Sequence, residues 1–238
     1  MTVSVFRALH HGRAADDPLI LPTPWDVSTA QIFADAGYPA LATPSMGIAV
    51  SLGYEDGSTP PDEMFAAVAR IARSVSVPVS ADVEDGYGLA PRDLVGRILE
   101  TGAVGCNLED SVGHKTLKDP QQHADWLAEV RAEAGDDLFI NARVDTFLVG
   151  TGDPADAVAR ARLYVAAGAE CVYPLLAPIE VLPVLREGIE GPINMVGQLD
   201  KASLAELARL GAARISFGPR MQQHAAAATS DLAARLLN

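Results

Sequence analysis

Three acidic side chains in this sequence are spaced so that they could bind a divalent cation. Asp82 and Glu84 follow a short apolar run and are separated by one residue, and Glu109 follows the next such run. If both runs are strands, Asp82 and Glu84 share a face and Glu109 can join them from the neighbouring strand. Three clustered carboxylates repel one another unless a cation neutralises them, and an all-oxygen site with room for water favours Mg²⁺ or Mn²⁺ over Zn²⁺. The alternative is three ordinary solvated acids on loops.

An arginine at the end of another apolar run could bind an anion. Residues 139–145 read FINARVD, so Arg143 shares a strand face with Asn141 and Asp145. A guanidinium can donate two parallel hydrogen bonds to a carboxylate or phosphonate, and a protein with a net charge of -13 needs such a local cation if its substrate is an anion. The alternative is a structural salt bridge to a neighbouring acid.

Small residues mark a third candidate region. At Ser45 and Gly47 the backbone N–H groups could approach an oxyanion closely, because neither side chain is bulky. Glycine and serine are common in any loop, so an ordinary connecting loop is the alternative here.

The elements that must position these residues follow a repeating pattern. Stretches typical of helices end at Gly37, Gly102, Gly168 and Gly211, and a short apolar run follows each glycine. These runs lack alternation, as expected for parallel strands buried on both faces. The predicted strands are 19–21, 40–43, 79–83, 105–108, 139–142, 171–173, 193–196 and 215–217. The predicted helices between and after them include 28–36, 62–74, 92–101, 123–134, 154–167, 179–187, 203–210 and 221–237.

Alternating strands and helices predict an α/β fold, which we interpret as a (β/α)8 TIM barrel formed by residues 1–238 as one domain. A doubly wound open sheet is the alternative, but no G-x-G-x-x-G motif follows the first strand. In a barrel, catalytic groups lie at the C-terminal ends of the strands, where the acids and Arg143 occur. The Ala-rich helix 221–237 either covers strand eight of its own barrel or reaches across to another subunit.

The composition limits which kinds of partner and which cellular compartment are expected. The net charge of -13 opposes binding to nucleic acid or to an anionic membrane, so a small molecule is the expected partner. No apolar run approaches the roughly 20 residues of a membrane helix, and residues 1–12 lack the apolar core of a signal peptide. Cys106 and Cys171 lie in apolar stretches and indicate buried, reduced thiols. We therefore expect a cytoplasmic protein.

The motifs together resemble the isocitrate lyase and phosphoenolpyruvate mutase superfamily over nearly the whole chain. The resemblance is carried, in order, by PWD at 24–26, SMG at 45–47, SLGYED at 51–56, ADVEDGYG at 81–88, NLED at 107–110 and ARVD at 142–145. It implies a barrel whose last helix is exchanged with a neighbouring subunit, usually in a tetramer. A homo-oligomer, either a dimer or a tetramer, is therefore expected.

The same resemblance implies roles for the candidate residues. The acids Asp82, Glu84 and Glu109 would hold Mg²⁺ largely through water. Backbone donors of Ser45, Met46 and Gly47 would bind the substrate carboxylate. Arg143 would contact the substrate, and Asp56 would lie near the reacting centre.

Members of this superfamily make or break C–C or C–P bonds next to a 2-oxo acid. The isocitrate and methylisocitrate lyases carry a Lys-Lys-Cys-Gly-His segment on the loop after the metal-binding glutamate, whereas residues 111–119 here read SVGHKTLKD. The absence of a cysteine from this loop argues against lyase chemistry. Mutases and phosphonopyruvate hydrolases carry a lysine there, to which only Lys115 could correspond. His114 and Lys115 either close over the substrate or form a solvated loop.

Three functional hypotheses follow. The leading one is Mg²⁺-dependent cleavage of a C–C bond in a small 2-oxo dicarboxylate such as oxaloacetate, with decarboxylation ahead of hydrolysis. The second is a C–P bond enzyme, mutase or hydrolase, that acts on phosphonopyruvate. The third is a relative that binds metal and ligand but has lost catalysis, against which the intact acids and Arg143 argue.

Overall fold

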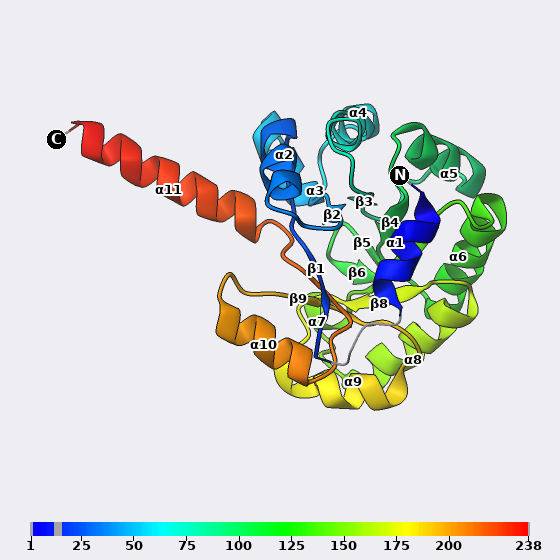
Figure 1. Ribbon diagram of the computed structural model, residues 1–238. Helices are drawn as coiled ribbons and strands as arrows, with labels where there is room; N and C mark the ends of the chain where they lie inside the picture. Colours follow the sequence, from blue (N-terminus) through cyan, green and yellow to red (C-terminus); the bar gives the residue numbers. More distant parts are fainter. Residues whose placement is uncertain (1, 12–15, 238) are drawn as a thin grey trace.

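The computed structural model describes residues 2–11 and 16–237, and within these ranges eight strands lie parallel around a central core (Figure 1). They are β1 Leu19–Leu21, β2 Leu41–Ala42, β3 Val79–Asp82, β4 Gly105–Leu108, β7 Phe139–Val144, β8 Cys171–Pro174, β9 Asn194–Val196 and β10 Arg214–Ser216. Residues 1, 12–15 and 238, which the one-domain expectation includes, lie outside the described part of the chain.

The strands close into a barrel. Five of them pair in the order β2-β3-β4-β7-β8, and three pair in the order β1-β10-β9. A parallel bridge between Val172 and Ile193 joins β8 to β9. On the other side, the N–H of Ala42 donates to the carbonyl of Pro22 at 3.0 Å and joins β2 to the end of β1. The α/β barrel prediction is therefore confirmed over the open doubly wound sheet.

Helices follow the strands and cover the outside of the barrel. They are α2 Val27–Asp35, α4 Pro61–Ala72, α5 Pro91–Glu100, α6 Pro120–Ala134, α8 Pro154–Ala166, α9 Leu182–Gly188 and α10 Lys201–Arg209, with a 3-10 turn, η1 Ile179–Val181, before α9. In α4, Met64, Val68 and Ile71 recur at three- and four-residue steps and are buried against the sheet. A proline at the first helical position fixes the start of α4, where its missing N–H costs no helical hydrogen bond.

A helix that the sequence patterns did not predict closes one end of the barrel. Helix α1 spans Val3–His10 and places Phe6 edge-on against Phe139, the first residue of β7, with ring centroids 5.2 Å apart. The His10 ring stacks on the same Phe139 at 4.2 Å. Because α1 covers the N-terminal ends of the strands, the C-terminal ends are left to carry the functional pocket.

Three more elements lie at that C-terminal end, in segments that the sequence analysis treated as loops. They are α3 Ser45–Leu52, α7 Thr146–Val149, and a hairpin formed by β5 Ser111–Val112 and β6 Thr116–Leu117. The hairpin is antiparallel and places its turn directly after β4.

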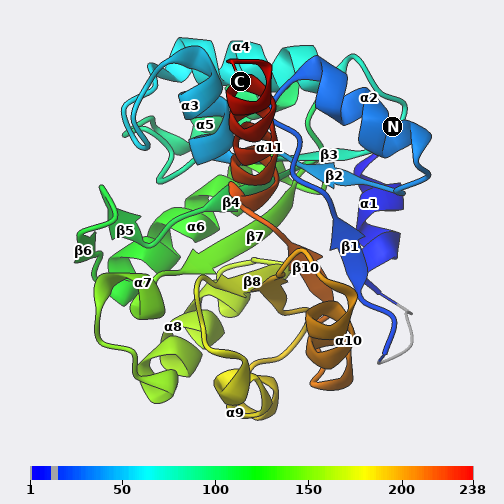
Figure 2. The ribbon, with the colours of Figure 1, turned by 90° about the vertical axis from the view of Figure 1, so that its left-hand side faces the viewer.

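The last helix, α11 Arg220–Leu237, projects away from the barrel (Figures 1 and 2). None of its described residues is buried, and Leu232, Leu236 and Leu237 are 48%, 78% and 89% exposed. The structure therefore contradicts the alternative that this helix covers strand eight of its own barrel. Its exchange with another subunit stays a prediction. Within residues 2–11 and 16–237, no helix has the length and apolar character needed to span a membrane.

Candidate active site

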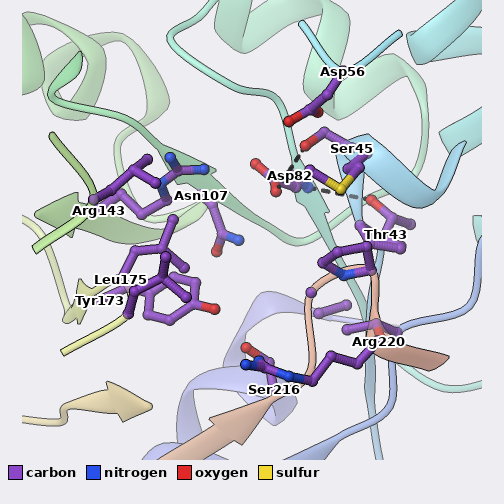
Figure 3. Close-up of a pocket in the computed structure, with 18 of the residues that line it drawn as sticks. Thr43, Ser45, Asp56, Asp82, Asn107, Arg143, Tyr173, Leu175, Ser216 and Arg220 are labelled. Atoms are coloured by element: carbon purple, nitrogen blue, oxygen red, sulfur yellow. Dashed lines mark hydrogen bonds between the residues drawn. The ribbon is translucent and has the colours of Figure 1, made fainter. Parts of the chain in front are cut away.

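A pocket of about 310 Å³ lies at the C-terminal ends of the barrel strands (Figure 3). It brings together residues that are far apart in the sequence. The candidate residues that line it are Ser45, Met46, Asp56, Asp82, His114 and Arg143. The expectation that the strand ends carry the site therefore agrees with the geometry.

The segment after β2 is helical rather than a loop. Helix α3 begins at Ser45 directly after Pro44, which is extended, and ends at Gly53 in the left-handed conformation. The first N–H groups of an α-helix have no partner within the helix, so Ser45, Met46 and Gly47 can offer theirs to an anion. A Cβ on Gly47 would lie 2.8 Å from the Pro44 ring, so a glycine permits this tight entry.

The acids Asp82 and Glu84 lie at the end of β3, next to that helix. Oδ2 of Asp82 accepts a hydrogen bond from the Ser45 hydroxyl at 3.1 Å. Oε1 of Glu84 is buried and has no hydrogen-bond partner among the described residues. Burial, followed by the negative charges of Asp82 and Glu109, raises the pKa of Glu84 to about 8. A divalent cation would relieve this unfavourable burial of negative charge.

The three acids do not converge directly on one point. Asp82 lines the main pocket, whereas Glu84 and Glu109 line an adjacent cavity of about 370 Å³. In the described part of the chain, no set of three or more His, Cys, Asp or Glu side chains is arranged to hold a metal ion directly. Donor chemistry and the orphaned Glu84 oxygen fit a Mg²⁺ ion that keeps several of its waters, which the family resemblance also implies.

Arg143 is buried at the end of β7 and is already paired with acids. Its Nε and Nη2 donate to the two carboxylate oxygens of Asp145, each at 2.8 Å, and its Nη1 donates to Glu109. Burial lowers the pKa of Arg143, but the two carboxylates outweigh this effect and raise it overall. Arg143 thus forms the structural salt bridge that was one alternative, and it also lines the pocket, as the other required.

The β5–β6 hairpin brings His114 into the site. Its Nδ1 lies 3.4 Å from Oδ2 of Asp56, and its Nε2 lies 3.1 Å from Oε2 of Glu109. The hydrogen bond to Glu109, opposed by burial and aided by the Glu109 charge, raises the pKa of His114 to about 9. His114 is therefore a cation at neutral pH that joins two acids. Lys115, its neighbour in the turn, is exposed and does not line the pocket.

A polar layer inside the barrel contains residues that were not among the predicted site residues. Asn107 lines the pocket, and its Oδ1 accepts hydrogen bonds from Nδ2 of Asn141 at 2.8 Å and from Nη2 of Arg214 at 3.4 Å. These donors leave the Asn107 amide N–H groups to face the pocket (Figure 3). Arg214 is fully buried, and its Nε and Nη1 have no partner among the described residues. The signal in the sequence is a polar residue inside an otherwise apolar strand.

The cysteines lie outside this chemistry. Cys106 and Cys171 are both buried, and burial raises the pKa of each thiol to about 12. A thiol with so high a pKa is almost entirely protonated at neutral pH. The interpretation of both residues as buried, reduced thiols is confirmed.

Comparison with known proteins gives one consistent family. The family model described as phosphoenolpyruvate phosphomutase matches residues 6–237. An uncharacterized protein of Mycobacterium tuberculosis is 33% identical over 95% of this chain and 89% of its own length. The crystal structure of a Burkholderia cenocepacia protein, described only as a candidate phosphonomutase, is 36% identical, covers 99% of this chain and 100% of its own, and superposes with a TM-score of 0.88.

More distant relatives differ in the reaction they catalyse. The 2-methylisocitrate lyase of Escherichia coli is 29% identical over 71% of this chain and 61% of its own. An oxaloacetate decarboxylase of Rhodopseudomonas palustris is 30% identical over 47% of this chain and 41% of its own. A phosphonopyruvate hydrolase solved with oxalate and Mg²⁺ shares the fold, with a TM-score of 0.85 and 21% identity over 99% of this chain and 87% of its own.

Proposed function

This chain belongs to the phosphoenolpyruvate mutase family, and on that premise we propose that it is a Mg²⁺-dependent enzyme that cleaves a C–C bond in a small 2-oxo dicarboxylate such as oxaloacetate. One observation carries the proposal. The free N–H groups at the start of α3, the acid Asp82 and the buried Arg143 border a single pocket at the mouth of the barrel. N–H donors can bind the substrate carboxylate, and acidic side chains beside them can hold the metal. A carboxylate substrate that chelates a metal requires both.

Asp82, Glu84 and Glu109 are the residues that would hold the metal, in large part through water. When bound, Mg²⁺ would withdraw the negative charge that develops on the 2-oxo oxygen as the bond breaks. The unpartnered Glu84 oxygen and its pKa of about 8 support a cation near these acids.

The chain's own side chains would bind and orient the substrate. The N–H groups of Ser45, Met46 and Gly47 would donate to the substrate carboxylate. The Asn107 amide, held by Asn141 and Arg214, would add donors to the same pocket. These donors are fixed before the substrate arrives, so they need little reorganisation as charge develops.

Arg143 and the His114 hairpin have supporting roles in this proposal. Arg143 would hold the Glu109 carboxylate in place while contacting the substrate, and its charge opposes the burial that raises the pKa of Glu109. His114 would cover the site while it bridges Asp56 and Glu109. Exclusion of water strengthens each of these electrostatic interactions.

The reaction of the isocitrate and methylisocitrate lyases is not supported. The hairpin that follows Glu109 has no cysteine, and the thiol of Cys106 is fully buried in β4 with its pKa raised to about 12. A C–P bond reaction on phosphonopyruvate is the second candidate, because the Burkholderia cenocepacia relative is described as a candidate phosphonomutase and is 36% identical to this chain.

Product analysis distinguishes these reactions. The protein would be incubated with Mg²⁺ and either oxaloacetate or phosphonopyruvate, with enzyme-free blanks. Pyruvate and CO₂ from oxaloacetate would indicate decarboxylation, and oxalate with acetate would indicate hydrolysis. Phosphate and pyruvate from phosphonopyruvate would indicate C–P bond hydrolysis, and its isomerisation to phosphoenolpyruvate without release of phosphate would indicate the mutase reaction. Consumption of neither substrate would overturn the proposal.

The metal site has its own test in Asp82→Asn. The amide keeps the size of the side chain and can still accept the Ser45 hydrogen bond, but it removes one negative charge. We expect Mg²⁺ affinity, measured by calorimetry, to fall by about tenfold or more. Glu100→Gln, an exposed charge at the end of α5, is the control and should bind Mg²⁺ as the wild type does. Equal affinities of the wild type and Asp82→Asn would exclude this site.

A further inference from the structure

Arg220 is the cation in the pocket whose charge no neighbour compensates. Arg143 is paired with Glu109 and Asp145, and His114 lies between Asp56 and Glu109. By contrast, the Arg220 guanidinium lines the pocket without an ion pair or a side-chain hydrogen bond to any residue in the described ranges. A half-buried guanidinium without a counterion is a ready receptor for an anion.

The backbone at the start of α11 places the Arg220 side chain in the lining of the pocket. Arg220 is the first residue of α11, and the chain turns into this helix at Gly218, whose φ of 52° lies in the left-handed region that favours glycine. In Figure 3 its side chain runs beside Ser216, on the side of the pocket away from Asp56 and Ser45. The pocket therefore has acids and α3 donors on one side and a free cation on the other.

The rest of the pocket lining is either apolar or polar without positive charge. Leu148, Leu175, Leu176 and Pro219 offer no side-chain donor, and polar residues such as Asn107, Tyr173 and Ser216 are uncharged donors. A ligand that binds at the α3 end and carries a second negative group therefore finds an uncompensated positive charge only at Arg220, as far as the described lining residues extend.

We infer that Arg220 binds the second anionic group of the substrate and so selects 2-oxo acids with two anionic groups over those with one. The inference rests on the proposed function for the identity of the 2-oxo acid end. The second group is a carboxylate or a phosphonate, since the guanidinium fork matches both.

Selection follows from two electrostatic effects. A protein with a net charge of -13 repels a doubly charged ligand, so a local cation is needed to bind it. A ligand with one anionic group would leave the half-buried guanidinium unpaired while displacing some of its water, which costs binding free energy.

Three variants test the inference, namely Arg220→Gln, Arg220→Lys and the control Arg209→Gln. Arg209 lies on α10 with its side chain 70% exposed and only a 4.0 Å contact to Glu206. Turnover would be measured with oxaloacetate and with phosphonopyruvate. Binding of oxaloacetate, 2-oxobutanoate and oxalate would be measured by calorimetry in the presence of Mg²⁺, where 2-oxobutanoate lacks the second anionic group and oxalate is too short to span the pocket.

We expect Arg220→Gln to raise KM for the preferred dianionic substrate by roughly 10- to 100-fold and to change kcat by less than about threefold. Arg220→Lys should restore part of the loss, because it keeps the charge but not the fork. Affinity for oxalate should stay at the wild-type value, which would show that the fold and the other end of the pocket are intact. If Arg220→Gln raises KM for phosphonopyruvate but not for oxaloacetate, the second anionic group of the substrate is a phosphonate.

Failure of the inference and failure of the proposed function give different results. Turnover of oxaloacetate with the same KM in wild type and Arg220→Gln would overturn the inference and keep the function. Absence of turnover would overturn the function. The inference would still be kept if the wild type binds oxaloacetate more tightly than 2-oxobutanoate and Arg220→Gln loses this preference. Equal binding of these two ligands by the wild type would overturn the inference in either case.

Discussion

At the scale of single residues, the charged groups of the site fall into two classes. Arg143 is buried but neutralised by Glu109 and Asp145, so its charge stabilises the arrangement of the strand ends. Glu84 and Arg220 form no ion pair with a described residue, and Oε1 of Glu84 is buried without a hydrogen-bond partner there. Buried or half-buried charge that the protein leaves unpaired is costly unless a ligand pairs with it. The uncompensated groups are therefore the ones that point to a bound cation and a bound anion.

His123, in α6 and away from the pocket, is another buried polar group without a hydrogen-bond partner among the described residues. Both of its ring nitrogens are buried without partners among the described residues, and its ring stacks on Trp126 with centroids 5.5 Å apart. Burial, followed by the charges of Lys118 and Arg160, lowers its pKa to about 3. The unfolded chain binds this proton near pH 6.5, whereas the folded chain does not until about pH 3. Stability is therefore lost as the pH falls through this window.

We expect His123→Phe to remove this pH dependence. Each pH unit below about 6.5 costs the wild type up to ~1.4 kcal/mol of unfolding free energy from this one group, and phenylalanine takes up no proton. Urea unfolding at pH 7 and pH 5 should show a smaller loss of stability in the variant, while the ring stacking on Trp126 is kept. His224→Gln, an exposed change on α11, should follow the wild type. Identical pH dependence of wild type and His123→Phe would refute this account.

At the scale of elements, the parallel strands and the outer helices could be predicted from sequence. Four of the barrel strands are short apolar runs after a helix-ending glycine, as at Gly102 before β4. Helix α3 could not be predicted in this way, because residues 45–52 are apolar or small on all sides and have no side-chain cap at Pro44. Helix α1 was missed because its burial depends on Phe139, which is distant in the sequence.

The site shows the same limit. Acids and Arg143 could be located from the sequence because they end strands, where a barrel carries its chemistry. Asn107 and Arg214 could not, since their hydrogen bond joins residues 107 positions apart. The pairing of His114 with Asp56 required the hairpin to fold back over the pocket, which no local pattern specifies. Long-range contacts of this kind are decided by the packed barrel.

The same substitution at two glycines is expected to change the stability of the protein in opposite directions. Gly96 lies inside α5 with open space where a Cβ would project, so Gly96→Ala should stabilise the protein by about 0.5–1 kcal/mol through helix propensity. Gly197 follows β9, and a Cβ there would lie 2.6 Å from Ile215 and 2.9 Å from Phe217. We expect Gly197→Ala to destabilise the protein by about 1–3 kcal/mol.

Urea unfolding of both variants at pH 7 measures these changes against the wild type. Each glycine is the control for the other, because the chemical change is the same and only the surroundings differ. A shift in the same direction for both would show that the packing around Gly197 does not decide the effect.

At the scale of the whole molecule, α11 runs from the pocket to an exposed region beyond the barrel. Its first residue, Arg220, lines the pocket, while the rest of the helix extends beyond the barrel (Figure 1), where Leu232, Leu236 and Leu237 are exposed. An 18-residue helix without a buried residue gains little stability from its own barrel. The family resemblance implies that a neighbouring subunit packs against it, which would also fix the end of the helix that carries Arg220.

We expect the wild type to be an oligomer and the double variant Leu232→Glu/Leu236→Glu to dissociate it, because charged side chains on the exposed face of α11 would have to be desolvated at the interface. Sedimentation velocity should show a mass that is a multiple of the chain mass for the wild type and a monomer for the double variant. Leu199→Glu is the matched control, since Leu199 is 46% exposed and lies outside α11, and it should keep the wild-type mass. A monomeric wild type, or an unchanged mass in the double variant, would show that α11 does not hold the subunits together.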